Sequence, residues 1–244
     1  MRQNIYDNPE FFEYYQRLRS TGITYNDFVE QPALMAMLPE LQGKNVLDLG
    51  CGAGQLAAYM VSQGAAHVTG ADISAKMLNQ APEHPQVRYI HGPMEELDFA
   101  PASFDLIVSS LAFHYVENYD ALMNQIAGWL RPGGHLVFST EHPVTTAKLD
   151  MDGWIEDHEG KRLYYALDNY AEEGIRHTHW VVDNVIKYHR TLSTLLNGMI
   201  RYGLQIEQVN EPEPIPGAIE KMPTLVNEWR KPSFIIFKAV KRGG

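Results

Sequence analysis

Three glycines within five residues, directly after a short apolar segment, constrain the fold of this chain more than any other feature. The segment Val46-Leu-Asp-Leu-Gly-Cys-Gly-Ala-Gly54 predicts a buried strand that enters a tight turn, and a helical pattern begins at Gln55. Glycine allows a sharp turn and lets a ligand approach the backbone without a Cβ in the way. The first N–H groups of the following helix are free to bind the same ligand. This order of elements predicts a ligand-binding turn within a βαβ unit.

Strand and helix patterns alternate along most of the remaining chain. Apolar residues with helical spacing separate the strand-like runs, as at Leu192, Leu195 and Met199. Short apolar runs predict strands at 45–49, 66–71, 86–91, 104–109, 135–140, 204–209 and 234–240. Strands that alternate with helices favour a parallel sheet with helices on both faces. The sequence therefore predicts a doubly wound α/β fold.

We expect a single domain over residues 1–244, built from three parts. Residues 1–41 are rich in aromatic residues and predict a helical N-terminal cap. Residues 42–143 and 191–240 predict the α/β core. Residues 144–190 break the pattern after the fifth strand, at the carboxyl end where open α/β sheets bind their ligands. The insertion is therefore expected to form a lid over the substrate.

Composition and charge disfavour several classes of protein. The single cysteine, Cys51, cannot form an internal disulfide, so nothing points to a secreted disulfide-rich fold. No signal peptide is evident, and no apolar run approaches the ~18 residues of a membrane span. With 30 acidic and 20 basic residues, the net charge of −10 disfavours a nucleic-acid partner. We expect a cytoplasmic protein that acts on a small molecule, without a membrane partner, as a monomer or a homodimer.

Two aspartates flank the glycine turn in the sequence. Asp48 lies two residues before the first glycine, and Asp72 ends the next predicted strand, 24 residues later. A dinucleotide-binding fingerprint would have its last glycine at position 55, which is Gln55 here. The Asp48 carboxylate would repel a pyrophosphate but would suit a cationic ammonium group. An acidic residue at the place of Asp72 accepts hydrogen bonds from two ribose hydroxyls. The pair indicates a ligand with both an ammonium group and a ribose.

Taken together, four motifs resemble those of class I S-adenosylmethionine-dependent methyltransferases. They are the glycine turn, Asp72, Phe104-Asp-Leu-Ile-Val-Ser-Ser110 and Leu130-Arg-Pro-Gly-Gly134. The resemblance covers residues 42–143 closely and is nearest to the small-molecule group that includes ubiquinone/menaquinone-biosynthesis and trans-aconitate methyltransferases. It implies a Rossmann-like seven-stranded sheet with the last strand antiparallel. It also implies S-adenosyl-L-methionine as cofactor, and direct in-line transfer of its methyl group to a small-molecule acceptor.

The resemblance also implies which residues contact the cofactor. The turn of Gly50, Cys51 and Gly52 would hold the methionine part, Asp48 its ammonium group and Asp72 the ribose. The residues expected to complete the cofactor site are Ile73, Met77, Met94, Glu95, Ser109 and Tyr14, with the neighbours Ser110 and Tyr15 also candidates. One departure is Pro93, at a position where such enzymes often carry an aspartate.

A general base is needed only if the acceptor must lose a proton before it attacks the methyl group. Histidine suits this role because it titrates near neutral pH. The candidates are His142, His114, Glu141 and His189, with His179 and Tyr188 also able to reach from the insertion. Within the insertion, residues 181–189 predict a strand. His177 and His179 would point to the same side if they also lie on a strand, but no third ligand has the spacing of a metal motif, so no metal is expected.

Two other functions stay open at this point. The same motifs would serve a protein that binds S-adenosylmethionine without catalysis. An NAD(P)-dependent oxidoreductase uses a related sheet, although Gln55 and Asp48 count against it. The sequence also leaves open whether oxygen, nitrogen, sulfur or carbon accepts the methyl group.

Overall fold

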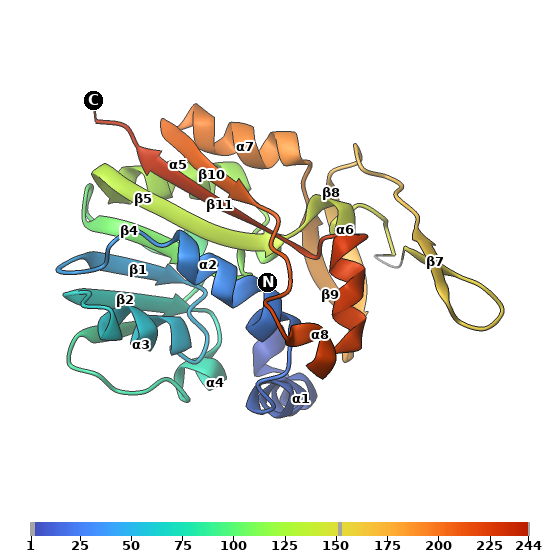
Figure 1. Cartoon of the computed structure of the whole chain (residues 1–244). Helices are drawn as coiled ribbons and strands as arrows, with labels where there is room; N and C mark the ends of the chain where they lie inside the picture. Colours follow the sequence, from blue (N-terminus) through green and yellow to red (C-terminus); the bar gives the residue numbers. More distant parts are fainter. Residues whose placement is uncertain (1–2, 151–152, 244) are drawn as a thin grey trace.

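A seven-stranded sheet runs through the middle of the computed structural model, which describes residues 3–150 and 153–243 (Figure 1). The strand order is β10-β11-β5-β4-β1-β2-β3. Strands β1 to β5 run parallel to one another, and β11 is antiparallel to both of its neighbours, β5 and β10. The strands are β1 (Asn45–Leu49), β2 (His67–Asp72), β3 (Val87–His91), β4 (Phe104–Ser109), β5 (Leu130–Glu141), β10 (Leu204–Asn210) and β11 (Phe234–Lys241). The predicted doubly wound sheet with an antiparallel last strand is confirmed.

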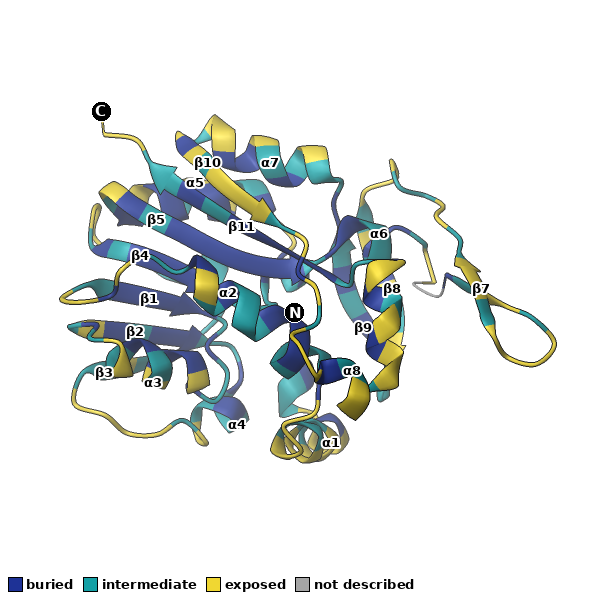
Figure 2. Ribbon diagram, in the orientation of Figure 1, coloured by how far each residue is buried: buried dark blue, intermediate teal, exposed yellow. Residues whose placement is uncertain are grey.

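Helices cover both faces of this sheet. The main helices are α2 (Gln31–Met37), α3 (Gln55–Ser62), α5 (Tyr119–Trp129) and α7 (Leu192–Arg201). One buried cluster joins α2 and α3 to Val46 of β1, and a second joins α5 and α7 to Leu47 and Leu49. Successive side chains of a strand point to opposite faces, so β1 contributes to both cores. Figure 2 shows the central strands almost wholly buried.

The N-terminal segment lies at the carboxyl ends of the parallel strands. Its elements are η1 (Ile5–Asp7), α1 (Pro9–Ser20) and η2 (Asn26–Glu30). Asn8 caps α1 by accepting hydrogen bonds from the N–H groups of Glu10 and Phe11. The residues around η1 contact two distant parts of the chain. Asn4 donates to the Ile73 carbonyl, and the Gln3 side chain exchanges two hydrogen bonds with the β9 backbone.

The insertion after β5 folds into a short helix and two separate hairpins. Its elements are α6 (Pro143–Thr146), β6 (Trp154–Glu156), β7 (Arg162–Tyr165), β8 (Gly174–Trp180) and β9 (Val182–His189). The β8–β9 hairpin lies at the carboxyl end of the sheet, whereas the β6–β7 hairpin projects away from the body of the protein (Figure 1). Figure 2 shows the β6–β7 hairpin as largely exposed. Only one of the two hairpins is therefore in a position to cover a ligand at the strand ends.

The remaining elements are short. They are α4 (Ala75–Leu78), η3 (Met94–Glu96), η4 (Phe113–Tyr115), α8 (Ala218–Lys221) and η5 (Pro223–Trp229). Ser74 caps α4, because its hydroxyl accepts a hydrogen bond from the Met77 N–H. Among the residues that the structure describes, no helix combines the length and the apolar character needed to cross a bilayer.

Candidate active site

A cavity of about 1140 Å³ opens at the carboxyl ends of the parallel strands. The glycine turn and the ends of β2, β4 and β5 form its floor, while η1, α1 and the β8–β9 hairpin form its other walls. Pockets for single small ligands usually measure about 300–1,000 Å³. The cavity is therefore large enough to hold two small molecules side by side.

The glycine turn begins where β1 ends. The Ala71 carbonyl of β2 accepts hydrogen bonds from the N–H groups of Gly50 (2.8 Å) and Cys51 (3.1 Å). Gly50 and Gly52 have φ angles of +77° and +53°, a region that residues with a Cβ rarely adopt. A Cβ on Gly50 would lie 2.5 Å from the Cβ of Ala112. Glycine is thus required here both by the backbone conformation and by the close approach of the loop after β4.

Alanine at Gly50 should destabilise the protein and disrupt its ligand site together. The left-handed conformation costs about 1–2 kcal/mol for a residue with a Cβ, and the clash with Ala112 adds about 1–3 kcal/mol. Gly133 is a matched control, because its φ is +78° but nothing lies within 4 Å of its Cβ position. Urea unfolding should show a clearly larger decrease in the free energy of unfolding for Gly50→Ala than for Gly133→Ala. Equal losses would show that the contact with Ala112 is unimportant.

Asp72, at the end of β2, links the glycine turn to the segment that follows β2. Its Oδ2 accepts a hydrogen bond from the Gly52 N–H, and its Oδ1 accepts one from the Ser74 N–H, both at 2.8 Å. Burial raises the pKa of this carboxyl, and the two N–H donors oppose that effect. A carboxylate oxygen accepts more than one hydrogen bond, so Asp72 can bind ribose hydroxyls and hold the turn at once.

Asp48 is almost completely buried at the cavity floor. Only 1% of the residue is exposed, and neither carboxylate oxygen has a hydrogen-bond partner among the described residues. Burial, together with the nearby charge of Asp72, raises the pKa of Asp48 to about 8. A buried carboxylate without partners favours a cationic ligand, because a positive charge offsets the cost of burial. The environment therefore fits the ammonium group that the sequence predicts near this residue.

Most of the predicted cofactor residues lie on this cavity. The nine that line it are Asp48, Gly50, Cys51, Gly52, Asp72, Ile73, Met77, Met94 and Glu95. Ser109 and Tyr14 do not. Ser109 is buried in the sheet, where its hydroxyl donates to the Leu49 carbonyl at 2.7 Å. Tyr14 is 39% exposed on the outside of α1, whereas the adjacent Tyr15 lines the cavity. Ser110 and Tyr15 thus take the places expected of their neighbours.

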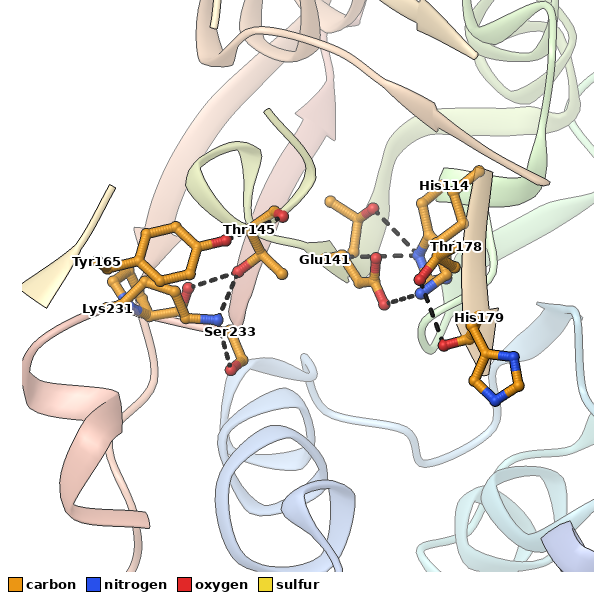
Figure 3. Close-up of polar contacts among 11 residues, drawn as sticks. His114, Glu141, Thr145, Tyr165, Thr178, His179, Lys231 and Ser233 are labelled. Carbon is orange, nitrogen blue, oxygen red and sulfur yellow. Dashed lines mark hydrogen bonds and ion pairs between the residues drawn. The ribbon is translucent and has the colours of Figure 1, made fainter. Parts of the chain in front are cut away.

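At the other end of the cavity, three polar side chains lie together. His114 comes from η4, Glu141 from the end of β5 and Lys187 from β9 (Figure 3, which labels His114 and Glu141). The Lys187 ammonium group donates to Glu141 Oε1 at 2.5 Å. Burial is the largest effect on the pKa of Glu141 and would raise it, but the charge and hydrogen bond of Lys187, together with His114 and Lys231, hold this pKa below its usual range. We call these three residues the polar end of the cavity.

The hydrogen bonds of His114 decide which of its nitrogens carries the proton. Nδ1 accepts a hydrogen bond from the Glu141 backbone N–H at 3.4 Å and lies 3.5 Å from the Thr140 hydroxyl (Figure 3). Burial lowers the pKa of His114 to about 4, so the ring is neutral at physiological pH. A neutral imidazole that accepts at Nδ1 carries its proton on Nε2. His114 is therefore built to donate a hydrogen bond to a ligand rather than to remove a proton from one.

His142 and His189, two other candidates for a general base, lie away from the cavity. His142 Nδ1 accepts from the Val144 N–H and caps α6, and its Nε2 lies 2.8 Å from Glu211. His189 Nδ1 lies 2.7 Å from the Thr146 hydroxyl, and its Nε2 lies 2.9 Å from the Tyr170 carbonyl. Both rings are occupied in structural contacts. His179 and Tyr188 do line the cavity, although His179 is exposed and pairs with Asp183.

Several residues on the cavity were not predicted from the sequence. Lys187 is one of them. It could have been found from its place on the strand predicted at 181–189, where it alternates with Val185 and His189. All three are buried on one face of β9. A wall of aromatic side chains is another. The rings of Tyr6, Tyr115 and Trp180 line the cavity beside the predicted Tyr15, and edge-to-face contacts link the four rings through Tyr6 and Phe11.

Neither a metal site nor a reactive thiol is evident in the described part of the chain. Within residues 3–150 and 153–243, no three side chains of His, Cys, Asp or Glu are grouped as metal ligands. Cys51 is buried in the glycine turn, and burial raises the pKa of its thiol. A thiol with a raised pKa is a poor nucleophile, in agreement with a structural role for this cysteine.

Comparison with known proteins gives consistent matches. A family model described as a methyltransferase domain matches residues 47–138. The crystal structure of an S-adenosylmethionine-dependent methyltransferase from Mesorhizobium loti is 42% identical, with a TM-score of 0.80, and the match covers 86% of this chain and 97% of that one. An uncharacterized protein from Haemophilus influenzae is 38% identical over 98% of this chain and 97% of its own length.

A further match concerns an enzyme with a named substrate. A malonyl-[acyl-carrier protein] O-methyltransferase from Enterobacter lignolyticus is 38% identical over 113 residues. That match covers 44% of this chain and 43% of that enzyme. The similarity is therefore restricted to less than half of either protein.

Proposed function

Because the chain belongs to the S-adenosylmethionine-dependent methyltransferase family, we propose that it methylates a small molecule bound beside this cofactor in the cavity. The predicted resemblance is confirmed, and S-adenosylmethionine is the cofactor. One observation carries the proposal: the glycine turn, the two aspartates and the three residues of the polar end all line the same cavity. The acceptor would then lie within reach of the methyl group.

The residues of the turn fit the cofactor. The bound cofactor supplies a methyl group on a positively charged sulfur, which is already activated for displacement. The turn of Gly50 and Gly52 would leave backbone space for its methionine part, the unpartnered Asp48 would hold its ammonium group, and Asp72 would accept hydrogen bonds from its ribose. The catalytic task of the protein is then mainly to align the acceptor in line and to exclude water.

The β8–β9 hairpin suits the role of lid that we assign to the insertion. Trp180 and Lys187 of the hairpin line the cavity, and Trp180 contacts Phe11 of α1 with 4.9 Å between ring centroids. The hairpin and the N-terminal cap thus close over the cavity from two sides. No residue of β6 or β7 lines the cavity, so the β6–β7 hairpin takes no part in this closure.

Small-molecule specificity is supported by the size of the cavity, which suits a cofactor and a small acceptor together, and by the net charge of −10, which disfavours nucleic acid. The match to an enzyme that acts on malonyl-[acyl-carrier protein] points the same way, although over less than half of that enzyme. Membership of the family decides against a nicotinamide dinucleotide as cofactor.

The first test is calorimetric titration of the purified protein with S-adenosylmethionine, S-adenosylhomocysteine and NADH. We expect micromolar affinity for the first two and no binding of NADH. A panel of small acceptors then follows, with S-adenosylhomocysteine formation as the readout. If the protein binds the cofactor but methylates none of the acceptors, a non-catalytic binder is supported instead. If it binds neither S-adenosylmethionine nor S-adenosylhomocysteine, the proposal is contradicted.

The affinity for S-adenosylmethionine should rise with pH between about 6 and 7.5. The pKa of about 8 leaves Asp48 mostly protonated in the free protein, whereas a bound ammonium group stabilises the carboxylate. Binding therefore releases a proton, and the affinity rises by up to about tenfold per pH unit below that pKa. Titrations in buffers with different heats of ionisation measure the released proton. Asp48→Asn should give a flat profile, and an unchanged slope in this variant would show that another group titrates.

A further inference from the structure

We propose that the methyl acceptor is a carboxylic acid, which binds at the polar end of the cavity as its carboxylate and is converted to a methyl ester. This inference rests on the proposed function and identifies the chemical class of its substrate. It depends on three features of the polar end: the hydrogen-bond donors that line the cavity, the balance of buried charges and the protonation of the titratable groups.

The donors come first. His114 lines the cavity and carries its proton on Nε2, because Nδ1 accepts from the Glu141 N–H. Lys187 has three N–H groups, of which one points to Glu141 Oε1. Two donors from different elements thus lie on one part of the cavity wall. Such a pair can hold one oxygen of a carboxylate and leave the other free to react, and hydrogen bonds to a charged group are the strong ones.

The buried charges favour an anion. Two cations, Lys187 and Arg190, and one carboxylate, Glu141, act on His114. Arg190 is buried, and its guanidinium group donates hydrogen bonds to backbone carbonyls, including that of Glu117. A third buried cation, Lys231, also acts on Glu141 and is held by the hydroxyls of Thr145 and Ser233 (Figure 3). Glu228 is a second buried carboxylate and acts on Lys231 in turn. The neighbourhood therefore holds three cations and two carboxylates, and a bound carboxylate would offset the excess positive charge.

The titratable groups at this end are poorly suited to remove a proton. His114 offers an N–H, and Glu141 is paired with Lys187. Burial also raises the pKa of Tyr115 and Tyr6, so their phenols stay protonated. His179 faces Asp183 on the exposed side of the hairpin, and Glu117 is exposed. An acceptor that arrives ionised needs no base, and carboxylic acids are ionised at neutral pH.

The reaction then balances without any proton transfer. One carboxylate oxygen attacks the methyl carbon with its own electron pair, and the new C–O bond forms as the C–S bond breaks. The electron pair of the C–S bond remains on sulfur. The products are a neutral methyl ester and S-adenosylhomocysteine. His114 and Lys187 orient the carboxylate by holding the oxygen that does not attack.

The experiment uses the full-length protein and S-adenosylmethionine labelled in its methyl group. The probes are small mono-, di- and tricarboxylic acids, each matched with an alcohol and an amine of the same skeleton. Mild alkali releases the methyl group of an ester as volatile methanol but leaves ethers and methylamines intact. We expect labelled, alkali-labile product from at least one acid. Alkali-stable product, or no ester from any acid while S-adenosylhomocysteine still binds, would overturn the inference.

A double variant separates the acceptor site from the cofactor site. Lys187→Met combined with Glu141→Gln removes both charges of the pair, so no unpaired charge stays buried. The KM for the acid should rise about 10- to 100-fold, while the affinity for S-adenosylhomocysteine stays unchanged. His114→Phe keeps the ring and removes the donor, and a rise of about tenfold is expected. An unchanged KM in both variants would also overturn the inference. Failure of S-adenosylhomocysteine to bind the wild-type protein would instead contradict the proposed function itself.

Discussion

Replacing Lys187 alone with methionine should lower the free energy of unfolding by about 3–5 kcal/mol, because the Glu141 carboxylate then stays buried without its counter-charge. Only one oxygen of Glu141 has a partner among the described residues, and that partner is Lys187. Urea unfolding at neutral pH measures the loss. The loss should shrink as the pH falls, because Glu141 takes up a proton once its pKa is no longer held down.

Two controls test this explanation. The double variant Lys187→Met/Glu141→Gln should recover most of the lost stability, since both charges are gone. Arg201→Met removes one partner of the exposed ion pair with Asp120, and such pairs contribute about 0–1 kcal/mol. If the double variant were as unstable as the single one, lost packing rather than buried charge would explain the effect.

Replacing Asp72 with alanine should weaken the binding of S-adenosylmethionine at least about 100-fold. Hydrogen bonds to a charged group contribute about 1.5–3 kcal/mol each, and the ribose offers two hydroxyls to this carboxylate. The same change also frees the N–H groups of Gly52 and Ser74, which the carboxylate holds at 2.8 Å. Calorimetric titration with S-adenosylhomocysteine measures the loss directly.

Asp7 provides the matched control for Asp72. Its carboxylate also binds the segment after β2, by accepting from the Ser74 hydroxyl at 2.6 Å and the Lys76 N–H at 3.1 Å, but it does not line the cavity. Asp7→Ala should cost about 1 kcal/mol of stability and leave the affinity within about fivefold of the wild type. Affinity within about threefold of wild type in Asp72→Ala would remove the ribose assignment.

The sequence predicted the core of the site better than its edges. The glycine turn and the two aspartates depend on local spacing and strand ends, which short segments encode. Whether Glu141 or His142 faces the cavity depends on one step of strand alternation, because neighbouring residues of a strand point to opposite sides. The choice between Tyr14 and Tyr15 depends in the same way on a rotation of about 100° per residue in α1. The residue types alone do not determine which side chain of each pair faces the cavity.

Other features depend on contacts between distant segments. Lys187 on β9 meets Glu141, which lies 46 positions earlier in the chain, and no local pattern determines the register of the β8–β9 hairpin that brings it there. The sequence indicated one strand in 181–189 but not its partner β8, nor the separate β6–β7 hairpin. No element was predicted for the segment that forms α8 and η5, which packs on Phe28 and Phe234 through tertiary contacts.

The contacts of the first residues also determine the order in which the protein can be completed. Asn4 bonds the carbonyl of Ile73, 69 positions away, and Gln3 bonds Asn184 and Ile186, more than 180 positions away. During synthesis Gln3 and Asn4 leave the ribosome well before these partners. Contacts with such long sequence separation form late, because the intervening loop must first be ordered. Strands β1 to β5 can therefore assemble while Gln3 is still unattached, and the binding chamber closes only after the insertion has been made.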